Sequence, residues 1–187
     1  DNNHEKQFWL EKQFWPLAGK TVLAHSVDVL RAHARVKTVI IVTSPHNLDR
    51  VRSQFGQSNC HVIQGGATRQ QSVYAGLQTA ADIDPAARFV AIHDAARPLL
   101  PARLLSTMLA TISDAVAGVA PVLPLADTLS CVDAQQHIDR IIDRAPIRAL
   151  QTPQLFWREA ITDLHKSYAD TPTYTDDCSL AVAAGHA

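Results

Sequence analysis

The chain predicts an α/β fold in which a Rossmann-like, doubly wound, mostly parallel sheet is covered by helices. Three observations predict it. Short apolar runs alternate with amphipathic helical stretches along most of the sequence. The runs are continuously apolar, which is typical of parallel strands buried on both faces. At 187 residues, 47% of them hydrophobic, the chain is long enough for a single domain with its own core.

The first half of the chain alternates helices and strands in a regular order. Apolar periodicity predicts a helix over Thr21 to His33, followed by a buried parallel strand over Val36 to Thr43. A second helix is expected over Leu48 to Phe55 and a short strand over His61 to Ile63. The apolar face of the first helix consists of Val22, Leu23, Val27 and Leu30, with Ser26 and Asp28 off that face.

The turn after the second strand is suited to close approach of a ligand. Residues 65–66 are both glycine, so backbone N–H groups can reach a bound molecule there. Thr68 and Gln71 form a capping box, which defines the start of a helix. Arg69 and Ser72 lie on its first turn, where anions and polar rings are attracted. A capped helix without a ligand is the alternative.

The central apolar run ends in charged residues. Phe89 to Ile92 is expected to be a buried strand, and the sequence HDAARP follows it at residues 93–98. Ligands collect beyond the carboxyl ends of strands in open α/β sheets, so these charged groups are site candidates. Arg97 offers a planar fork for phosphate or carboxylate, and Asp94 offers oxygens for a metal or a ribose hydroxyl. A structural ion pair between them is the alternative.

A change of pattern in the second half predicts an inserted arm. A helix is expected over Leu104 to Ile112 and a strand over Ala117 to Leu123. From Asp127 to Ile142 two short strands surround the turn Asp133 to Gln136 with no crossover helix between them. This predicts a β-hairpin arm at about residues 125–148. A hairpin with so little core needs a surface to pack on.

Two helices are expected to complete the domain. One runs from about Phe156 to Tyr168. The other is opened by Thr175 as its N-cap, followed by Asp176 and Asp177, whose charges complement the helix dipole.

Bulk properties exclude several classes of protein. The formal net charge of -1 provides no field to gather nucleic acid or an anionic membrane. No apolar stretch approaches the ~20 residues of a membrane span, and the polar start has no signal-peptide pattern. The cysteines lack a CxxC pair and the histidines lack the spacing of metal ligands, which argues against a structural zinc site. The sequence contains no GxGxxG motif at a strand-to-helix turn, which argues against a nicotinamide-dependent dehydrogenase. A cytoplasmic protein without a nucleic-acid or membrane partner is expected.

Several elements, taken in order, resemble one enzyme family. The pentapeptide EKQFW occurs twice before residue 16, and only the second copy continues into PLAGK. Lys12, Gln13 and Phe14 of that copy, together with PLAGK at residues 16–20, resemble a lysine-bearing segment of that family. GGxxRQxSV follows at residues 65–73, HDAARP at 93–98, LQTPQ at 150–154 and TDD at 175–177. From about residue 11 onward, the chain resembles 2-C-methyl-D-erythritol 4-phosphate cytidylyltransferase. The resemblance implies the nucleotidyltransferase type of the fold.

The resemblance implies roles for residues on the nucleotide side of a site. Lys12 would contact the phosphates of CTP and stabilise the transition state, with Lys6 of the first repeat copy as its rival. Gly66 and Ser72 would contact the cytosine end. Asp94 and Ala95 would lie near the ribose and the Mg2+-bound triphosphate, with Asp94 as the candidate metal ligand.

Other matching residues would bind the acceptor, methylerythritol phosphate. Arg97, Thr128 and Thr175 resemble groups that hold it. Arg144 and Thr152 resemble residues that the arm presents to the active site of a neighbouring subunit, which implies a homodimer. A phosphate oxygen of the acceptor would attack the α-phosphorus of CTP in line, so the protein supplies positioning and charge, with Arg144 and Lys12 as the catalytic groups.

The sequence also departs from the family pattern. The family begins with a strand and a glycine-rich loop that cradles the triphosphate, whereas only Asp1 to Leu10 precede the lysine segment here. It also carries an NxKVT-like segment with a second lysine after the last helix. The first strand lies mid-sheet, so its loss is expected to leave two unpaired strand edges and a poorly stable fragment.

Three interpretations of function follow. The leading one is cytidylyl transfer to methylerythritol phosphate, in a chain that could be the first half of a fusion with a cyclodiphosphate synthase. The second is cytidylyl transfer to another polyol phosphate, such as ribitol 5-phosphate. The third is a non-catalytic dimerising remnant.

Overall fold

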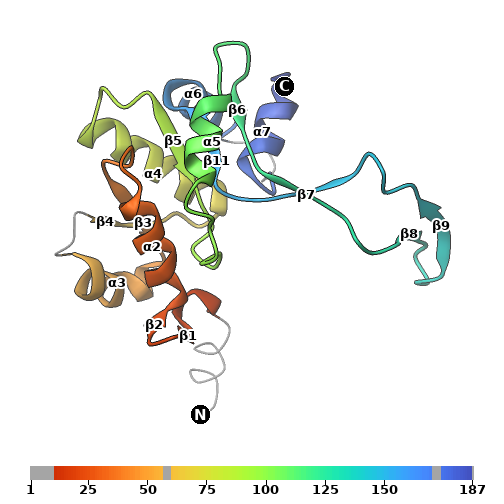
Figure 1. The fold of residues 1–187 in the computed structure, drawn as a ribbon, viewed down its shortest axis with the longest axis horizontal. Coiled ribbons are helices and arrows are strands. Elements are labelled where there is room, and N and C mark those ends of the chain that lie inside the picture. Colours follow the sequence, from red (N-terminus) through yellow and green to blue (C-terminus); the bar gives the residue numbers. More distant parts are fainter. Residues whose placement is uncertain (1–10, 57–59, 170–173, 187) are drawn as a thin grey trace.

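The computed structural model describes residues 11–56, 60–169 and 174–186, which form an α/β body and a projecting arm (Figure 1). The elements of the first half are η1 (Lys12–Phe14), β1 (Pro16–Leu17), β2 (Lys20–Thr21), α2 (Val22–Ala32), β3 (Val39–Thr43), η2 (Pro45–Asn47), α3 (Leu48–Phe55), β4 (Cys60–Gln64), α4 (Arg69–Ile83) and β5 (Phe89–Ile92). Those of the second half are α5 (Leu104–Thr111), β6 (Gly118–Val119), β7 (Val122–Pro124), β8 (Leu129–Val132), β9 (Ile138–Ile142), β10 (Arg148–Leu150), β11 (Gln154–Trp157), α6 (Arg158–Ser167) and α7 (Asp177–Ala183).

Two separate sheets form the centre of the body, and β1 and β2 pair in a further two-stranded sheet near the start of the described chain. β3 and β4 pair in parallel, with Val39 opposite Cys60 and Thr43 opposite Gln64. In the second sheet β11 lies between β5 and β6 and runs antiparallel to both. The predicted α/β class with an inserted hairpin is confirmed, and within the described residues its sheets are mixed in direction.

A cavity of about 660 Å³ separates the two sheets. It is bordered by β3 and β5, each of which is an edge strand in the described part of the chain. Apolar side chains line it, among them Ile41, Val42, Val90, Leu77 and Val27. Within the described residues, the expectation of two unpaired strand edges is therefore confirmed. β5 was expected to be buried, yet its residues are only partly buried and Ala91 is exposed, because no strand of the described part of the chain pairs with it on this side.

The core follows this division. One cluster joins η1, α2, α3, β3 and β4 through residues such as Phe14, Val27 and Val51. A second cluster joins α4, α6, α7 and β11 through Leu77, Phe156, Ile161 and Ala181. A third packs α5 on β11 through Leu105, Met108 and Leu155. Helices from both halves of the chain thus cover the sheets, as the amphipathic patterns predict.

Three helices of the first half form where the periodicity predicts them. The Thr21 side chain caps α2 by accepting a hydrogen bond from the Ala24 N–H, and α3 spans the predicted residues. The predicted capping box of Thr68 and Gln71 begins α4. The placement of Ser26 was wrong: it is 2% exposed, because its hydroxyl donates to the Ala95 carbonyl oxygen at 2.9 Å. A tertiary hydrogen bond explains this burial.

Four predictions in the remaining strands and helices were wrong. The parallel strand begins at Val39, not Val36. The strand expected over residues 117–123 is two strands, β6 and β7, which belong to different sheets. Residues 156–157 were assigned to a helix, but they end the buried strand β11, and α6 begins only at Arg158. Finally, Asp176, not Thr175, is the N-cap of α7, because its side chain accepts from the Ser179 N–H.

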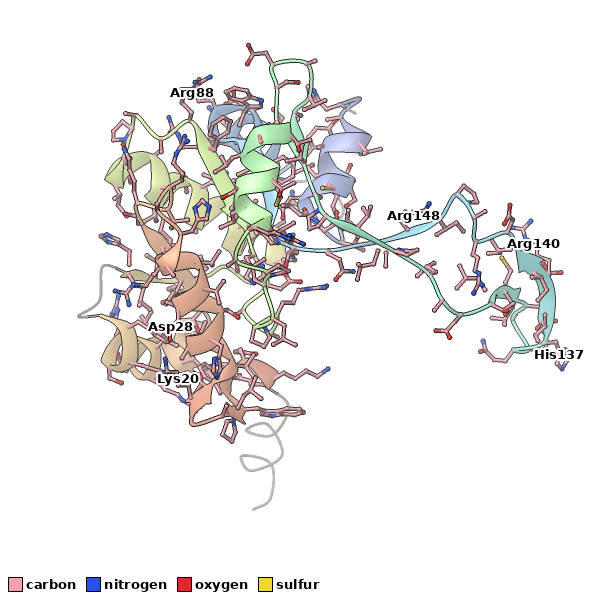
Figure 2. The ribbon with its side chains drawn as sticks, in the orientation of Figure 1. Lys20, Asp28, Arg88, His137, Arg140 and Arg148 are labelled. Atoms are coloured by element: carbon pink, nitrogen blue, oxygen red, sulfur yellow. The ribbon has the colours of Figure 1, made fainter. Side chains whose placement is uncertain are left out.

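The predicted arm projects far from the body. β8 and β9 form an antiparallel hairpin at its tip, and β7 and β10 pair at its base. Figure 2 shows His137 and Arg140 at the tip and Arg148 between the tip and the body. The tip exposes Val132, Ile138 and Ile141, so this single chain does not bury its own apolar residues there.

Candidate active site

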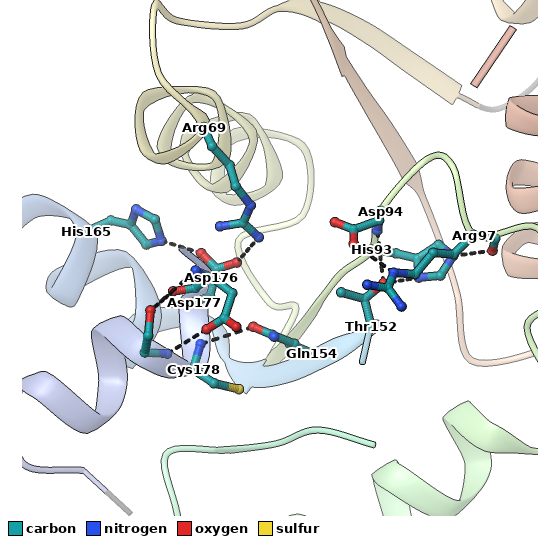
Figure 3. A network of polar contacts seen from close by, with 11 residues as sticks. Arg69, His93, Asp94, Arg97, Thr152, Gln154, His165, Asp176, Asp177 and Cys178 are labelled. Atoms are coloured by element: carbon teal, nitrogen blue, oxygen red, sulfur yellow. Dashed lines mark hydrogen bonds and ion pairs between the residues drawn. The ribbon is translucent and has the colours of Figure 1, made fainter. Parts of the chain in front are cut away.

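Asp94 and Arg97 form an ion pair just beyond the carboxyl end of β5 (Figure 3). The Arg97 Nε donates to Asp94 Oδ2 at 2.8 Å, and the Arg97 guanidinium also contacts the Gln151 amide oxygen. Both side chains are 42% exposed, and an ion pair this exposed contributes only about 0–1 kcal/mol. A phosphate or carboxylate ligand can therefore compete for Arg97 at low cost.

Thr152 and His93 hold this turn in place. The Asp94 N–H donates to Thr152 Oγ1 at 3.1 Å, and Thr152 Oγ1 lies 3.0 Å from His93 Nδ1. His93 Nε2 in turn lies 3.0 Å from the Arg97 carbonyl oxygen. All three contacts are satisfied when the Thr152 hydroxyl donates to Nδ1 and the imidazole carries its proton on Nε2. Burial lowers the pKa of His93, which outweighs the hydrogen bond to Arg97 and the charge of Asp94 and favours this neutral form.

The position of Thr152 corrects one expectation. We expected the arm to present Thr152 to a neighbouring subunit. The residue instead lies between β10 and β11, outside the arm, and bonds to the turn of its own chain. The sequence could not show this, because the contact joins residues far apart in the chain.

The glycine turn after β4 is tightly built. The Gly66 N–H donates to Ser72 Oγ at 3.1 Å, and the Ser72 hydroxyl donates to the Thr68 carbonyl oxygen at 2.9 Å. A Cβ on Gly66 would lie 2.3 Å from Gln71 Cβ, so only glycine fits this turn. Ser72 thus has a structural role within the turn, and its predicted contact with cytosine stays a prediction.

Lys12 lies on η1 with an exposed side chain. The carboxylate of Glu11 accepts from Asn47 at 2.8 Å and lies 2.9 Å from His46 Nε2, which ties this segment to the residues after β3. Phe14 of η1 is buried in the cluster against which Ala95 packs. The segment carrying Lys12 and the turn carrying Asp94 therefore adjoin one core cluster. Within the described residues no hydrogen bond or ion pair links Lys12 to Asp94 or Arg97, and Lys6 lies outside them.

The predicted acceptor residues are divided between the body and the arm. Thr175 is exposed immediately before α7, on the body. Thr128 and Arg144 are exposed on the arm, where the Arg144 guanidinium donates to the Ala126 carbonyl oxygen. Among the described residues no hydrogen bond or ion pair links Thr128 or Arg144 to Asp94 or Arg97, and the arm that carries them projects away from the body (Figure 1).

A buried network that the sequence did not indicate joins three helices. Asp177 is 1% exposed; its Oδ2 accepts from Arg69 Nη2 at 2.6 Å and its Oδ1 from His165 Nε2 at 2.8 Å. Burial opposes ionisation of Asp177, but the hydrogen bonds from His165 and Arg69 outweigh it and hold its pKa below the ordinary value. No sequence pattern pairs these residues, because the contacts are entirely tertiary.

Other chemistries have little support in the described part of the chain. Burial, reinforced by the charges of Asp176 and Asp177, raises the pKa of Cys178 to about 12, so this thiol remains protonated and is a poor nucleophile. Among the described residues, no three or more His, Cys, Asp or Glu side chains form a metal-binding group. None of the helices described is long and apolar enough to cross a membrane.

The fold and this edge of the sheet define an α/β domain of the nucleotidyltransferase type. The chain belongs to the 2-C-methyl-D-erythritol 4-phosphate cytidylyltransferase family, whose model matches residues 6–187.

Curated relatives agree with this assignment. The chain is 37% identical over 177 residues to the bifunctional enzyme IspD/IspF of Rhodopseudomonas palustris, covering 93% of this chain and 44% of that protein. It is 34% identical to 2-C-methyl-D-erythritol 4-phosphate cytidylyltransferase of Saccharopolyspora erythraea, covering 93% of this chain and 78% of that protein. The chain thus spans less than half of the bifunctional relatives.

Solved structures show the same fold. The cytidylyltransferase of Thermus thermophilus is 27% identical with a TM-score of 0.77, and the match covers 94% of this chain and 80% of that one. Another crystal structure, of a 4-diphosphocytidyl-2C-methyl-D-erythritol synthase, is 30% identical with a TM-score of 0.79 and covers 95% of this chain and 81% of the other. The predicted fold class is therefore confirmed.

Proposed function

We propose that the protein transfers the cytidylyl group of CTP to 2-C-methyl-D-erythritol 4-phosphate and releases diphosphate. Family membership supports this assignment, and one structural observation carries it. The guanidinium of Arg97 is held half exposed at the carboxyl end of β5 by Asp94 and Gln151, in a turn that Thr152 and His93 fix in place. Such a fork is suited to the phosphate of the acceptor.

The reaction needs positioning and charge more than a protein nucleophile. A phosphate oxygen of the acceptor forms a bond to the α-phosphorus of CTP, while the bond from that phosphorus to the bridging oxygen of the β-phosphate breaks. Lys12 is proposed to neutralise charge on the CTP phosphates. Arg97 is proposed to orient the attacking phosphate, and Gly66 and Ser72 to adjoin the cytosine end.

We also propose that Asp94 and Ala95 lie next to the triphosphate of bound CTP, and that Asp94 provides a carboxylate for Mg2+. The ion, when bound, would neutralise charge on the leaving diphosphate. Asp94 has one oxygen, Oδ2, bonded to Arg97, and a cation carrying the triphosphate would compete with that bond. The carboxylate and the guanidinium would then each face a substrate group.

A homodimer would complete the site. The exposed apolar residues of the arm need a surface, and a second copy of the chain can supply it around a two-fold axis. The arm would bring Arg144 and Thr128 to the other subunit, next to its Arg97 and Thr175. We further propose a cytoplasmic location, which suits the three free cysteines.

Turnover with purified protein tests the assignment. Release of diphosphate should require CTP together with methylerythritol phosphate, and substitution of Arg97→Met should raise the KM for the acceptor more than that for CTP. Arg103→Met, an exposed arginine before α5, is the matched control. Turnover with ribitol 5-phosphate alone would move the assignment to another polyol phosphate. Well-folded protein that dimerises and binds no CTP would be a non-catalytic remnant.

A further inference from the structure

The buried carboxylate of Asp177 joins the two halves of the candidate site. Its Oδ2 accepts from Arg69, on the first turn of α4, and its Oδ1 accepts from His165, near the end of α6. The two oxygens therefore serve two different helices, as Figure 3 shows. Arg69 lies within residues 65–72, the segment that begins with the glycine pair, and Thr175 lies two residues before Asp177 in sequence.

The first turn of α7 is also held from the sheet. The Gln154 side chain, 1% exposed on β11, accepts the Cys178 N–H at 3.0 Å. Asp176 caps the helix by accepting from the Ser179 N–H at 2.7 Å. Asp177 therefore stands on a turn with little freedom to move. Its carboxylate meets α4 through Arg69.

Arg69 is the main compensating charge for Asp177. His165 is 2% exposed, and its Nδ1 has no hydrogen-bond partner among the described residues. His165 Nε2 donates to Asp177 Oδ1 at 2.8 Å, so the imidazole supplies the second hydrogen bond to the carboxylate, beside the permanently charged guanidinium. The carboxylate charge is balanced by the guanidinium, and loss of Arg69 leaves the buried carboxylate without its counterion.

We propose that Asp177 and Arg69 are a pair of positioning residues that couple the glycine turn at residues 65–72 to the start of α7 at residues 174–178. The assignment of these segments to CTP and to the acceptor rests on the proposed function. The coupling itself rests on the contacts. Asp177 and Arg69 need touch neither substrate, yet both binding segments depend on their ion pair.

Amide hydrogen exchange, measured without substrates, tests the coupling directly. In Asp177→Asn, exchange should rise roughly tenfold not only at residues 174–178 but also at residues 65–68, within the range typical of coupled sites. In Arg69→Gln it should rise in the same two segments. The double variant should exceed the more affected single variant by little, because both changes break one interaction.

The matched control is Asp28→Asn, which breaks the exposed ion pair of Lys20 and Asp28, 2.5 Å long and remote from α7 (Figure 2). Exchange in both segments should then stay at the wild-type level. If Arg69→Gln fails to fold, Arg69→Lys keeps the charge without the planar fork and should still raise exchange in both segments. An increase confined to the segment that carries the substitution, in either variant, would overturn the proposal.

Kinetics separate positioning from mere support of the fold. Coupling predicts that Asp177→Asn raises the KM for CTP and the KM for the acceptor together, with the folded fraction matched by circular dichroism. A purely structural role would lower the amount of active enzyme and leave both KM values unchanged, which would contradict the proposal. Wild-type protein without cytidylyl transfer would refute the proposed function alone, because the exchange experiment needs no turnover.

Discussion

Replacement of Thr152 by valine gives a sharp test of how the turn at residues 93–97 is held. Valine has nearly the same shape as threonine, so the substitution removes the hydroxyl and leaves the packing almost unchanged. The Asp94 N–H then loses its acceptor at 3.1 Å, and His93 Nδ1 loses its donor at 3.0 Å. Two neutral hydrogen bonds of about 0.5–1.5 kcal/mol each predict a loss of about 1–3 kcal/mol in the free energy of unfolding.

Urea unfolding followed by circular dichroism measures this loss. Thr152→Ser is the matched control, since it keeps the hydroxyl and removes only a methyl group. The serine variant should retain most of the stability that the valine variant loses. Thr152→Val should also raise the KM for the acceptor, because the turn that carries Arg97 is less firmly fixed. Equal stability of the valine variant and the wild type would refute the hydrogen-bond scheme.

Three further outcomes are expected. Gly66→Ala should destabilise the protein by about 1–3 kcal/mol in urea unfolding, since the added Cβ would lie 2.3 Å from that of Gln71; an unchanged midpoint would contradict the tight turn. Asp177 has a lowered pKa, so its contribution to stability is present above the ordinary carboxyl value of 3.8 and is lost as the pH falls below it. The melting temperature should therefore fall less between pH 7 and pH 3 for Asp177→Asn than for the wild type. Ile141→Asp should convert a dimer to monomer in light scattering, whereas Gln135→Ala at the same tip should not; a dimer in both would place the interface elsewhere.

Local signals predicted the helices of the first half. The capping residues Thr21 and Thr68 bond to backbone groups within one helical turn, so the sequence alone predicts where these helices begin. The same holds for the hairpin, where a polar turn between apolar runs predicts β8 and β9. These elements depend on contacts between near neighbours.

Predictions failed where a distant contact decides the structure. Residues 155–157 are a short apolar run that suits a strand or a buried helix equally, and pairing with β5 and β6 makes it part of a strand. Ser26 was placed off the apolar face because it is polar, yet the carbonyl of Ala95 gives it a buried acceptor. In each case the deciding group lies far away in sequence.

The amino-acid sequence by itself determined the alternation of helices and strands, the arm, and the family with its candidate residues Asp94 and Arg97. These depend on composition, spacing and local hydrogen bonds, all of which are present in the linear chain. Only the tertiary structure decided that Thr152 serves its own turn, that Ser26 is buried against Ala95, and that Asp177 joins α4 to α7. A buried hydrogen bond or ion pair forms where packing brings two groups together and excludes water. A local sequence pattern does not predict such a contact, because the two residues are far apart in the chain.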